Sequence, residues 1–243
     1  MKKIFIVILF FFSFSVKAQH IELALQAYGG LFHFSGGTTS SESAVNLASS
    51  IYGQSPNNNP FGSNNAFSYG FGARATLVKK SGFIFGLSAG YESLRSSLAI
   101  SSVYINSNIS GNTFYDIISS YQINASGQTI LTSNQLIMSP FIGYRIKVNK
   151  VKIDFMPGVD FGFNLKSTEA DQASDTKGNN YFTSTNLQRL PTDLRLKFGA
   201  AMSFLNYGLT AGFSQGLTNL NKNTANNSAN SEFLQLGISY KLL

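Results

Sequence analysis

The chain has 243 residues, of which 43% are hydrophobic, 14% are aromatic and only 12% are charged. The charged share is about half of that in a typical soluble domain. The excess of 18 basic over 11 acidic residues is small and scattered, which argues against a nucleic-acid-binding surface. Cysteine is absent, so neither a disulfide framework nor a lipid-modified N-terminal cysteine is available.

The first residues of the chain predict an export signal. Lys2 and Lys3 precede an unbroken apolar run at residues 4–12, and the small residues Val16 and Ala18 stand where a signal peptidase cuts. The alternative is a membrane anchor helix, but that needs roughly 20 apolar residues and this run is shorter. We therefore expect residues 1–18 to be a cleaved signal peptide and residues 19–243 to form one outer-membrane β-barrel domain.

A strict alternation of apolar and polar residues is the strongest pattern in the rest of the chain. Apolar residues occupy every second position at 67–77 and again at 83–91, and small or polar residues lie between them. A tight turn at residues 79–82 separates the two segments. This period of two, interrupted by a short turn, predicts a β-hairpin with one apolar face.

The same pattern recurs along the chain and predicts eight strands. They cover residues 21–34, 67–77, 83–92, 135–148, 151–166, 193–204, 207–214 and 234–242. Tight turns at 79–82, 149–150 and 205–206 alternate with long loops at 35–66, 96–134, 167–190 and 215–232, of which the second shows some capacity for strand extension. Short turns at one end and long loops at the other are typical of an all-β, up-and-down transmembrane barrel with periplasmic turns and extracellular loops.

The alternation alone also fits a soluble β-sandwich, and side-chain volume decides between the two. An eight-stranded barrel has room inside only for small side chains and a few large ones. The apolar face, rich in Phe, Leu, Ile and Tyr, would overfill it, so that face belongs in lipid. At 151–166 the opposite face carries Lys152, Asp154, Asp160 and Lys166, and a mid-membrane lysine costs roughly 2–4 kcal/mol. The pattern therefore favours a membrane barrel.

Four segments, in order, resemble the PorT-like family of outer-membrane β-barrel proteins from Bacteroidetes-type bacteria. They are Ser-Pro-Phe-Ile-Gly-Tyr-Arg-Ile at 139–146, Met-Pro-Gly-Val-Asp-Phe-Gly at 156–162, Gly-Leu-Thr-Asn at 216–219 and Leu-Gly-Ile-Ser-Tyr-Lys-Leu at 236–242. The resemblance spans most of residues 20–243. It implies an outer-membrane location and a barrel, and it suggests a role in a protein-secretion and gliding apparatus that works through partner contacts.

Charged residues on the inward face of the predicted strands are the candidate site. They are Glu22, Arg74, Glu92, Arg145, Asp154, Asp160, Asp193 and Arg195. These residues predict either a charged conduction path or a plug in which opposite charges pair, and the narrow bore of eight strands favours the plug. Pro140 and Pro157 remove ladder donors on neighbouring strands, so we expect a bulge or a local break there.

No catalytic, cofactor or metal site is expected. The two histidines, His20 and His33, have no positioned nucleophile, and no cluster has metal-ligand spacing. The leading hypothesis is a monomeric, non-enzymatic outer-membrane scaffold with a plugged lumen, whose loops 35–66, 96–134, 167–190 and 215–232 contact a protein partner or surface ligand. The alternatives are a component of a PorT-like secretion or gliding apparatus and a small-solute channel. The expected partners are the outer-membrane bilayer and such a surface ligand, and not nucleic acid.

Overall fold

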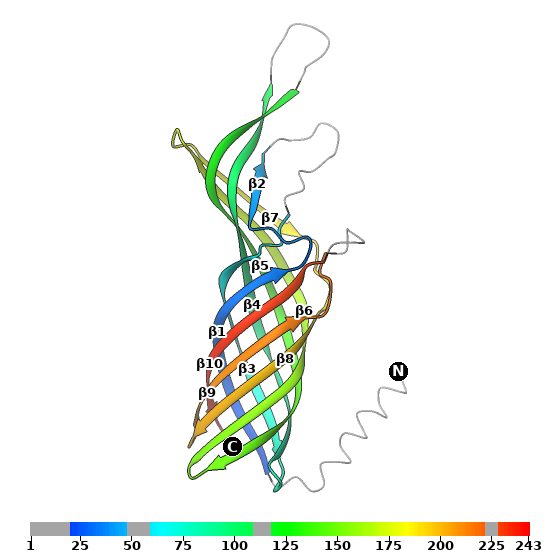
Figure 1. Ribbon diagram of the computed structural model, residues 1–243, viewed down its shortest axis with the longest axis vertical. Helices are drawn as coiled ribbons and strands as arrows, with labels where there is room; N and C mark the ends of the chain where they lie inside the picture. The colour runs from blue at the N-terminus through cyan, green and yellow to red at the C-terminus, as the bar shows by residue number, and fades with distance from the viewer. Residues whose placement is uncertain (1–19, 48–58, 109–117, 222–227) are drawn as a thin grey trace, which may run out of the picture.

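The computed structural model describes residues 20–47, 59–108, 118–221 and 228–243, which form an all-β structure. Eight strands make a closed antiparallel ring in the order β4-β3-β1-β10-β9-β8-β6-β5, with β5 pairing back to β4 (Figure 1). The predicted eight-stranded barrel is therefore confirmed. The ring strands are β1 (His20–Ser35), β3 (Asn64–Val78), β4 (Phe83–Asn108), β5 (Ile118–Val148), β6 (Val151–Asp175), β8 (Asp193–Phe204), β9 (Tyr207–Gly216) and β10 (Asn230–Lys241).

The seam between the first and last ring strands closes the barrel. β1 and β10 pair without a register shift from Ala24 opposite Lys241 to Ser35 opposite Asn230. Because each ring strand has two hydrogen-bonded neighbours, the ring exposes no free strand edge. None of the residues that the structure describes forms a helix long and apolar enough to cross a membrane.

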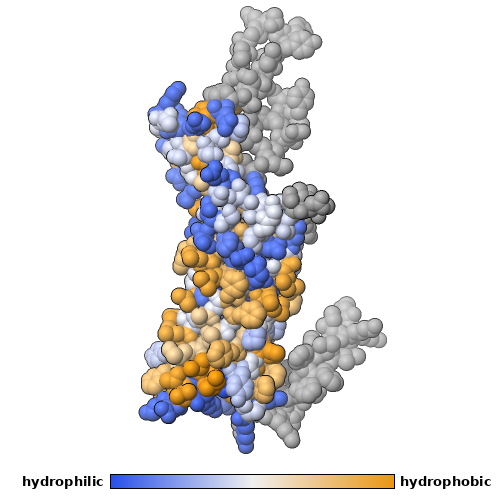
Figure 2. Space-filling view, viewed as in Figure 1, coloured by the Kyte–Doolittle hydropathy of each residue, from blue (hydrophilic) through white to orange (hydrophobic). Residues whose placement is uncertain are grey.

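The outer wall of the ring is apolar and the inner wall is polar, as the alternation predicts. Phe71 on β3, Phe155 on β6 and Leu236 on β10 are 56%, 50% and 68% exposed, whereas Glu92 and Arg195 are fully buried inside. Figure 2 shows the outward apolar side chains as a broad belt with hydrophilic residues at both ends. A belt of exposed large apolar side chains around a closed ring is the surface of a transmembrane barrel.

The three tight turns lie at one end of the barrel. In two of them a residue other than glycine takes a left-handed conformation, Asn149 with φ 54° and Leu205 with φ 53°. Positive φ fits a two-residue hairpin turn because its twist matches that of the flanking strands. Asparagine accepts this conformation readily, whereas leucine is strained in it.

Two of the four predicted long loops are largely wrong. β4 continues to Asn108, β5 begins at Ile118 and β6 continues to Asp175, so most of 96–134 and much of 167–190 is strand. Two further strands appear, β2 (Glu42–Asn46) and β7 (Asn180–Leu187), where loops were expected. Ser and Thr fill buried positions in these extensions, and this hides the alternation from a hydrophobicity pattern.

A bulge in β6 explains one wrong assignment of side-chain direction. Gln135 pairs with Asn164, whereas the preceding Asn134 pairs with Lys166, so Leu165 is an extra residue. The insertion reverses which positions of β6 face inward. Lys166 was predicted to face the lumen, but it is exposed on the outside.

The prolines leave the register intact. The β5–β6 ladder pairs Met138 with Phe161, Phe141 with Gly158 and Tyr144 with Phe155, all in one register. Between those positions, residues 139–140 and 142–143 of β5 do not pair with β6. The expectation of a bulge or a local break at the prolines is met by the break in pairing.

Beyond the ring, the strand extensions form a protruding sheet in the order β2-β4-β5-β6-β7 (Figure 1). β2 pairs parallel to β4, and β7 pairs antiparallel to β6. One face of this sheet buries a small apolar cluster of Val45, Ile100, Val103, Ala125 and Ala173. The residues 1–19, 48–58, 109–117 and 222–227 lie outside the described residues, and so does the predicted signal peptide.

The hairpin that joins β6 to β7 is held by Asp175. Its carboxylate accepts hydrogen bonds from Asn179 Nδ2 at 2.8 Å, Tyr181 Oη at 3.0 Å, and the backbone N–H groups of Lys177 and Asn179. These bonds, led by the one from the Asn179 side chain, lower the pKa of Asp175 to about 2. Gly178 supplies the left-handed position of the turn, with φ 86°.

Candidate functional site in the barrel lumen

The deepest part of the lumen holds a charge cluster centred on Arg195, which we call the upper cluster. Arg195 Nη2 lies 2.6 Å from Glu92 Oε2 and 3.6 Å from Asp160 Oδ2, and Arg195 Nε lies 3.8 Å from Asp193 Oδ2. Lys197 Nζ contacts the other oxygen of Asp160 at 3.3 Å. These residues meet because β4, β6 and β8 all present them on the inward face.

Neutral donors add hydrogen bonds to the three carboxylates in the upper cluster, although Asp160 Oδ1 accepts none from the described residues. Tyr28 Oη donates to Glu92 at 2.8 Å, and Gln135 Nε2 donates to it at 2.9 Å. Ser214 Oγ donates to Asp160 at 3.1 Å, and Ser231 Oγ donates to Asp193 at 2.9 Å. Hydrogen bonds and ion pairs of this kind lower the cost of burying a carboxylate.

A second group, the lower cluster, lies near the tight turns. Arg145 forms a bidentate pair with Asp154 at 2.6 and 2.8 Å, and its Nη2 also lies 2.8 Å from Glu22. Glu22 additionally accepts from Lys241 Nζ at 2.9 Å and from Lys152 Nζ at 3.2 Å. Glu22 thus links β1, β5, β6 and β10 across the bore.

Arg74 lies between the two clusters and differs from the other predicted members. Its guanidinium donates to Met156 Sδ at 3.6 Å, and among the described residues no carboxylate lies within 4.0 Å of it. It borders a cavity of about 50 Å³ that Lys197, Tyr28 and Gln235 also line. Gln235 Oε1 has no hydrogen-bond partner among the described residues. The cavity has room for a few water molecules.

An apolar cluster, the apolar cap, fills the loop end of the lumen above the upper cluster. Its buried members are Phe32, Phe34, Phe61, Leu94, Leu131, Leu220, Ala229 and Phe233. Phe32 and Phe34 lie edge to face with ring centroids 5.0 Å apart, and Phe34 stands likewise 5.2 Å from Phe61. Between the cap and the upper cluster the free volume is about 10 Å³.

The structure places seven of the eight candidate residues in these two ion-pair clusters and Arg74 between them. Tyr28, Gln135, Ser214 and Ser231 were not singled out from the sequence. The inward positions of the first three follow from the predicted strands, whereas Ser231 was expected in a loop and lies in β10. Tyr28 could have been recognised from the sequence, because it is a large residue with a hydroxyl at an inward position of β1, where Ala24 and Gly30 are small.

The histidines contact carboxylates at opposite ends of the barrel. His20 Nε2 lies 3.1 Å from Glu22, and His33 Nε2 lies 3.4 Å from Glu232. In the part of the chain that the structure describes, no group of three or more His, Asp or Glu residues could hold a metal ion. The described contacts of the two histidines are with carboxylates and include no serine or threonine hydroxyl that could act as a nucleophile.

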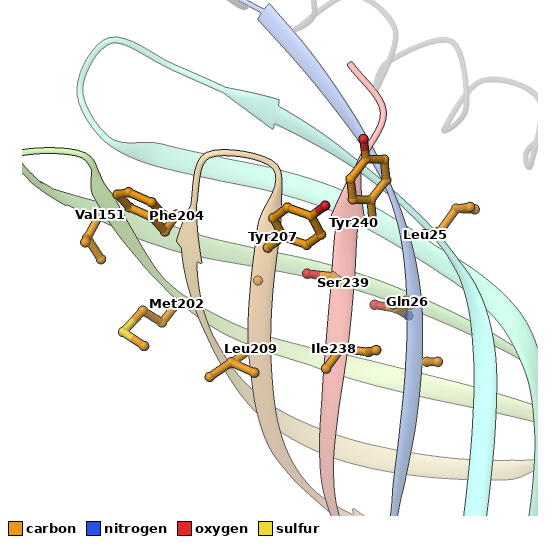
Figure 3. Close-up of a pocket in the computed structure, with 12 residues that line it drawn as sticks. Leu25, Gln26, Val151, Met202, Phe204, Tyr207, Leu209, Ile238, Ser239 and Tyr240 are labelled. Carbon is orange, nitrogen blue, oxygen red and sulfur yellow. The ribbon is translucent and has the colours of Figure 1, made fainter.

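A large hollow lies on the outer wall and not in the lumen. This apolar groove has a volume of about 660 Å³ and opens near the tight turns (Figure 3). Phe204, Tyr207 and Tyr240 line it closest to the turn, and Met202, Leu209 and Ile238 line it further along the strands. Because these side chains belong to the apolar belt, the groove faces the bilayer.

Comparison with known proteins gives only distant likenesses. No protein-family model matches the chain, and no curated protein matches it. Among solved structures, it is similar to Ail, the attachment invasion locus protein of Yersinia pestis, with 11% identity, a TM-score of 0.30, and coverage of 91% of this chain and 97% of that one. A structure of Ail in complex with the heparin analogue sucrose octasulfate is similar at 9% identity and a TM-score of 0.27, over 90% of this chain and 97% of that one.

Neisserial surface protein A is similar at 12% identity and a TM-score of 0.34, over 92% of this chain and all of that one. Because all three TM-scores lie below 0.5, we draw nothing about the function of this chain from them.

Proposed function

We propose that this protein is a non-enzymatic outer-membrane barrel that acts as a scaffold, with its protruding sheet as the surface that contacts a partner. The observation that carries this proposal is the continuation of β4, β5 and β6 beyond the apolar belt as a sheet with two outer strands. An ordered sheet above a bilayer presents a fixed surface to a partner, which irregular loops do not. Transmembrane β-barrels belong to outer membranes, and this supports the location.

The outer strand β7 is the part of the sheet best suited to contact. It pairs with β6 from Asn180 to Leu187, and among the described strands none pairs with its other edge. A free strand edge offers a row of backbone donors and acceptors to an extended peptide. Phe182 on this strand is 64% exposed, an apolar anchor next to that edge.

The contents of the lumen support a plug rather than a channel. The apolar cap and the two charge clusters lie in the lumen, and the cavities beside them have volumes of only about 10 and 50 Å³. The alternative role in a secretion or gliding apparatus rests on the PorT-like resemblance alone. A scaffold that works through β7 is therefore the function the geometry supports best.

The proposal is tested by capture experiments on outer membranes solubilised in mild detergent. Wild-type protein is compared with Phe182→Lys, because a lysine at a sheet edge opposes strand addition. The matched control is Gln128→Lys: Gln128 shares a row and a face with Phe182, through Gln172, but lies on a strand paired on both sides. We expect the partner to be lost with Phe182→Lys and kept with Gln128→Lys. Equal recovery with all three proteins would contradict the proposal.

A further inference from the structure

The described charges are distributed unequally between the two ends of the barrel. The tight-turn end carries six lysines, and the described carboxylates at that end, Glu22 and Asp154, are buried in the lower cluster. The loop end and the protruding sheet mix carboxylates with cations. The six lysines, which we call the basic rim, are Lys79, Lys80, Lys147, Lys150, Lys152 and Lys241.

Three members of the basic rim contact neither a carboxylate nor an aromatic ring among the described residues. Lys152 and Lys241 reach inward to Glu22, and Lys79 lies over the Phe85 ring, 5.0 Å from its centroid. By contrast, the remaining three lysines are exposed and have no carboxylate within 4.0 Å among the described residues. They are Lys80, Lys147 and Lys150.

These lysines gather in one sector of the rim. The turn at 79–82 lies against β5, because Arg145 N donates to Gly82 O at 2.7 Å. Lys147 is the register partner of Lys152 across the next hairpin, so two like charges stand directly opposite each other. Such a pair is unfavourable without a counter-charge, and only Lys152 has one inside the protein.

The basic rim stands at the level of the lipid headgroups. Next to it lies a girdle of exposed aromatic rings, in which Phe83 packs against Tyr144 at 5.5 Å and Tyr207 packs against Tyr240 at 5.3 Å. Aromatic girdles mark the boundary between hydrocarbon and headgroups in membrane barrels. Val151, the residue that follows Lys150 in the sequence, lines the apolar groove, which offers a seat for an acyl chain (Figure 3).

We propose that the exposed lysines of the basic rim bind the phosphates of anionic phospholipids in the adjoining leaflet, in preference to zwitterionic ones. This inference rests on the proposed membrane insertion of the barrel. A lysine near an anionic bilayer surface favours binding by roughly fivefold, and this attraction weakens as salt rises. The missing counter-charges of Lys80 and Lys150, which lie in the turns, are thus supplied by the membrane.

The test is lipid retention in native mass spectrometry, with phosphatidylglycerol and phosphatidylethanolamine of identical acyl chains supplied in equal amounts. We expect the wild-type barrel to retain phosphatidylglycerol about fivefold more than phosphatidylethanolamine. Lys80→Gln/Lys150→Gln should lose most of this preference. Lys166→Gln/Lys177→Gln removes the same charge from the outer face of β6 and from the protruding sheet, and should keep it.

Two results would overturn the inference: equal retention of both lipids by the wild type, or equal loss of preference in both double variants. A separate measurement distinguishes this failure from failure of the proposed function. A closed barrel inserted into neutral phosphatidylcholine vesicles runs faster on a gel before heating than after it, because its edgeless sheet resists detergent. Insertion without lipid preference refutes only the basic rim, whereas absence of insertion refutes the membrane barrel itself.

Discussion

Replacing Arg195 with methionine is the most direct perturbation of the plug. The arginine is fully buried and lies within 4.0 Å of three carboxylates. At an effective dielectric constant of 20, the 2.6 Å contact with Glu92 alone is worth about 6 kcal/mol of attraction. Part of this is offset by the cost of burying the guanidinium, and removal of one member of a buried pair has a net cost of about 3–5 kcal/mol.

The neutral donors keep the expected cost within that range. Without Arg195, Glu92 still accepts from Tyr28 and Gln135, and Asp160 still contacts Lys197. Three buried carboxylates then face a single remaining cation, so a large loss of unfolding free energy remains.

The loss is measured by urea unfolding in vesicles, followed by the gel mobility of the folded barrel. Arg189→Met, at an exposed arginine, is the control and should change the unfolding free energy by less than about 0.5 kcal/mol. Adding Glu92→Gln to Arg195→Met should recover at least about 1 kcal/mol, because the pair is coupled. A cost below about 1 kcal/mol for Arg195→Met, or no coupling with Glu92, would refute the plug as an electrostatic unit.

Three further outcomes follow from the structure. Phe155→Arg should weaken insertion into vesicles by about 2–4 kcal/mol, because the residue is on the lipid face. Phe182→Arg, on the protruding sheet, should leave insertion unchanged in the same assay. Equal effects of the two changes would contradict the assignment of the two surfaces. Because the pKa of Asp175 is depressed to about 2 from an ordinary 3.8, its carboxylate stabilises the β6–β7 hairpin above pH 3.8. This contribution is lost as the pH falls towards 2. Protection of the hairpin amides against hydrogen exchange should therefore fall in the wild type but not in Asp175→Asn. An equal pH dependence of protection in both proteins would contradict the prediction. Planar-bilayer recordings of the wild-type protein should show no steady large conductance steps, and such steps would favour the channel instead.

The barrel could be predicted from the sequence because its outer wall must be apolar at every second position. Phe155, Val159 and Phe161 on β6 make the period visible, and the tight turns fix the connections. The charged inner residues followed from the same parity, but their pairing did not. Arg195 contacts Glu92 across 103 positions of sequence, and the strand pattern does not specify which inward charges share a level of the bore.

The protruding sheet could not be predicted from the same signal. Outside the bilayer a strand needs no apolar outer face, so the buried Ser133 lies between Thr132 and Asn134, which are of similar polarity. The Leu165 bulge also reversed the parity of β6, and a single extra residue leaves no trace in composition. In this part of the structure the strands are stabilised by local hydrogen bonds, such as those of Asp171 with Thr129 and Thr183, and not by an apolar face in lipid.

The β1–β10 seam has a consequence for how the protein is made. Because β1 finds one of its two partners only in β10, the ring cannot close until nearly the whole chain is present. Until then β1, already paired with β3, has an open edge and the apolar belt is only partly assembled, a state prone to aggregation in water. The first ring strand to be made therefore gains its second partner last. Until β10 pairs with it, the open edge of β1 must be protected from pairing with other strands.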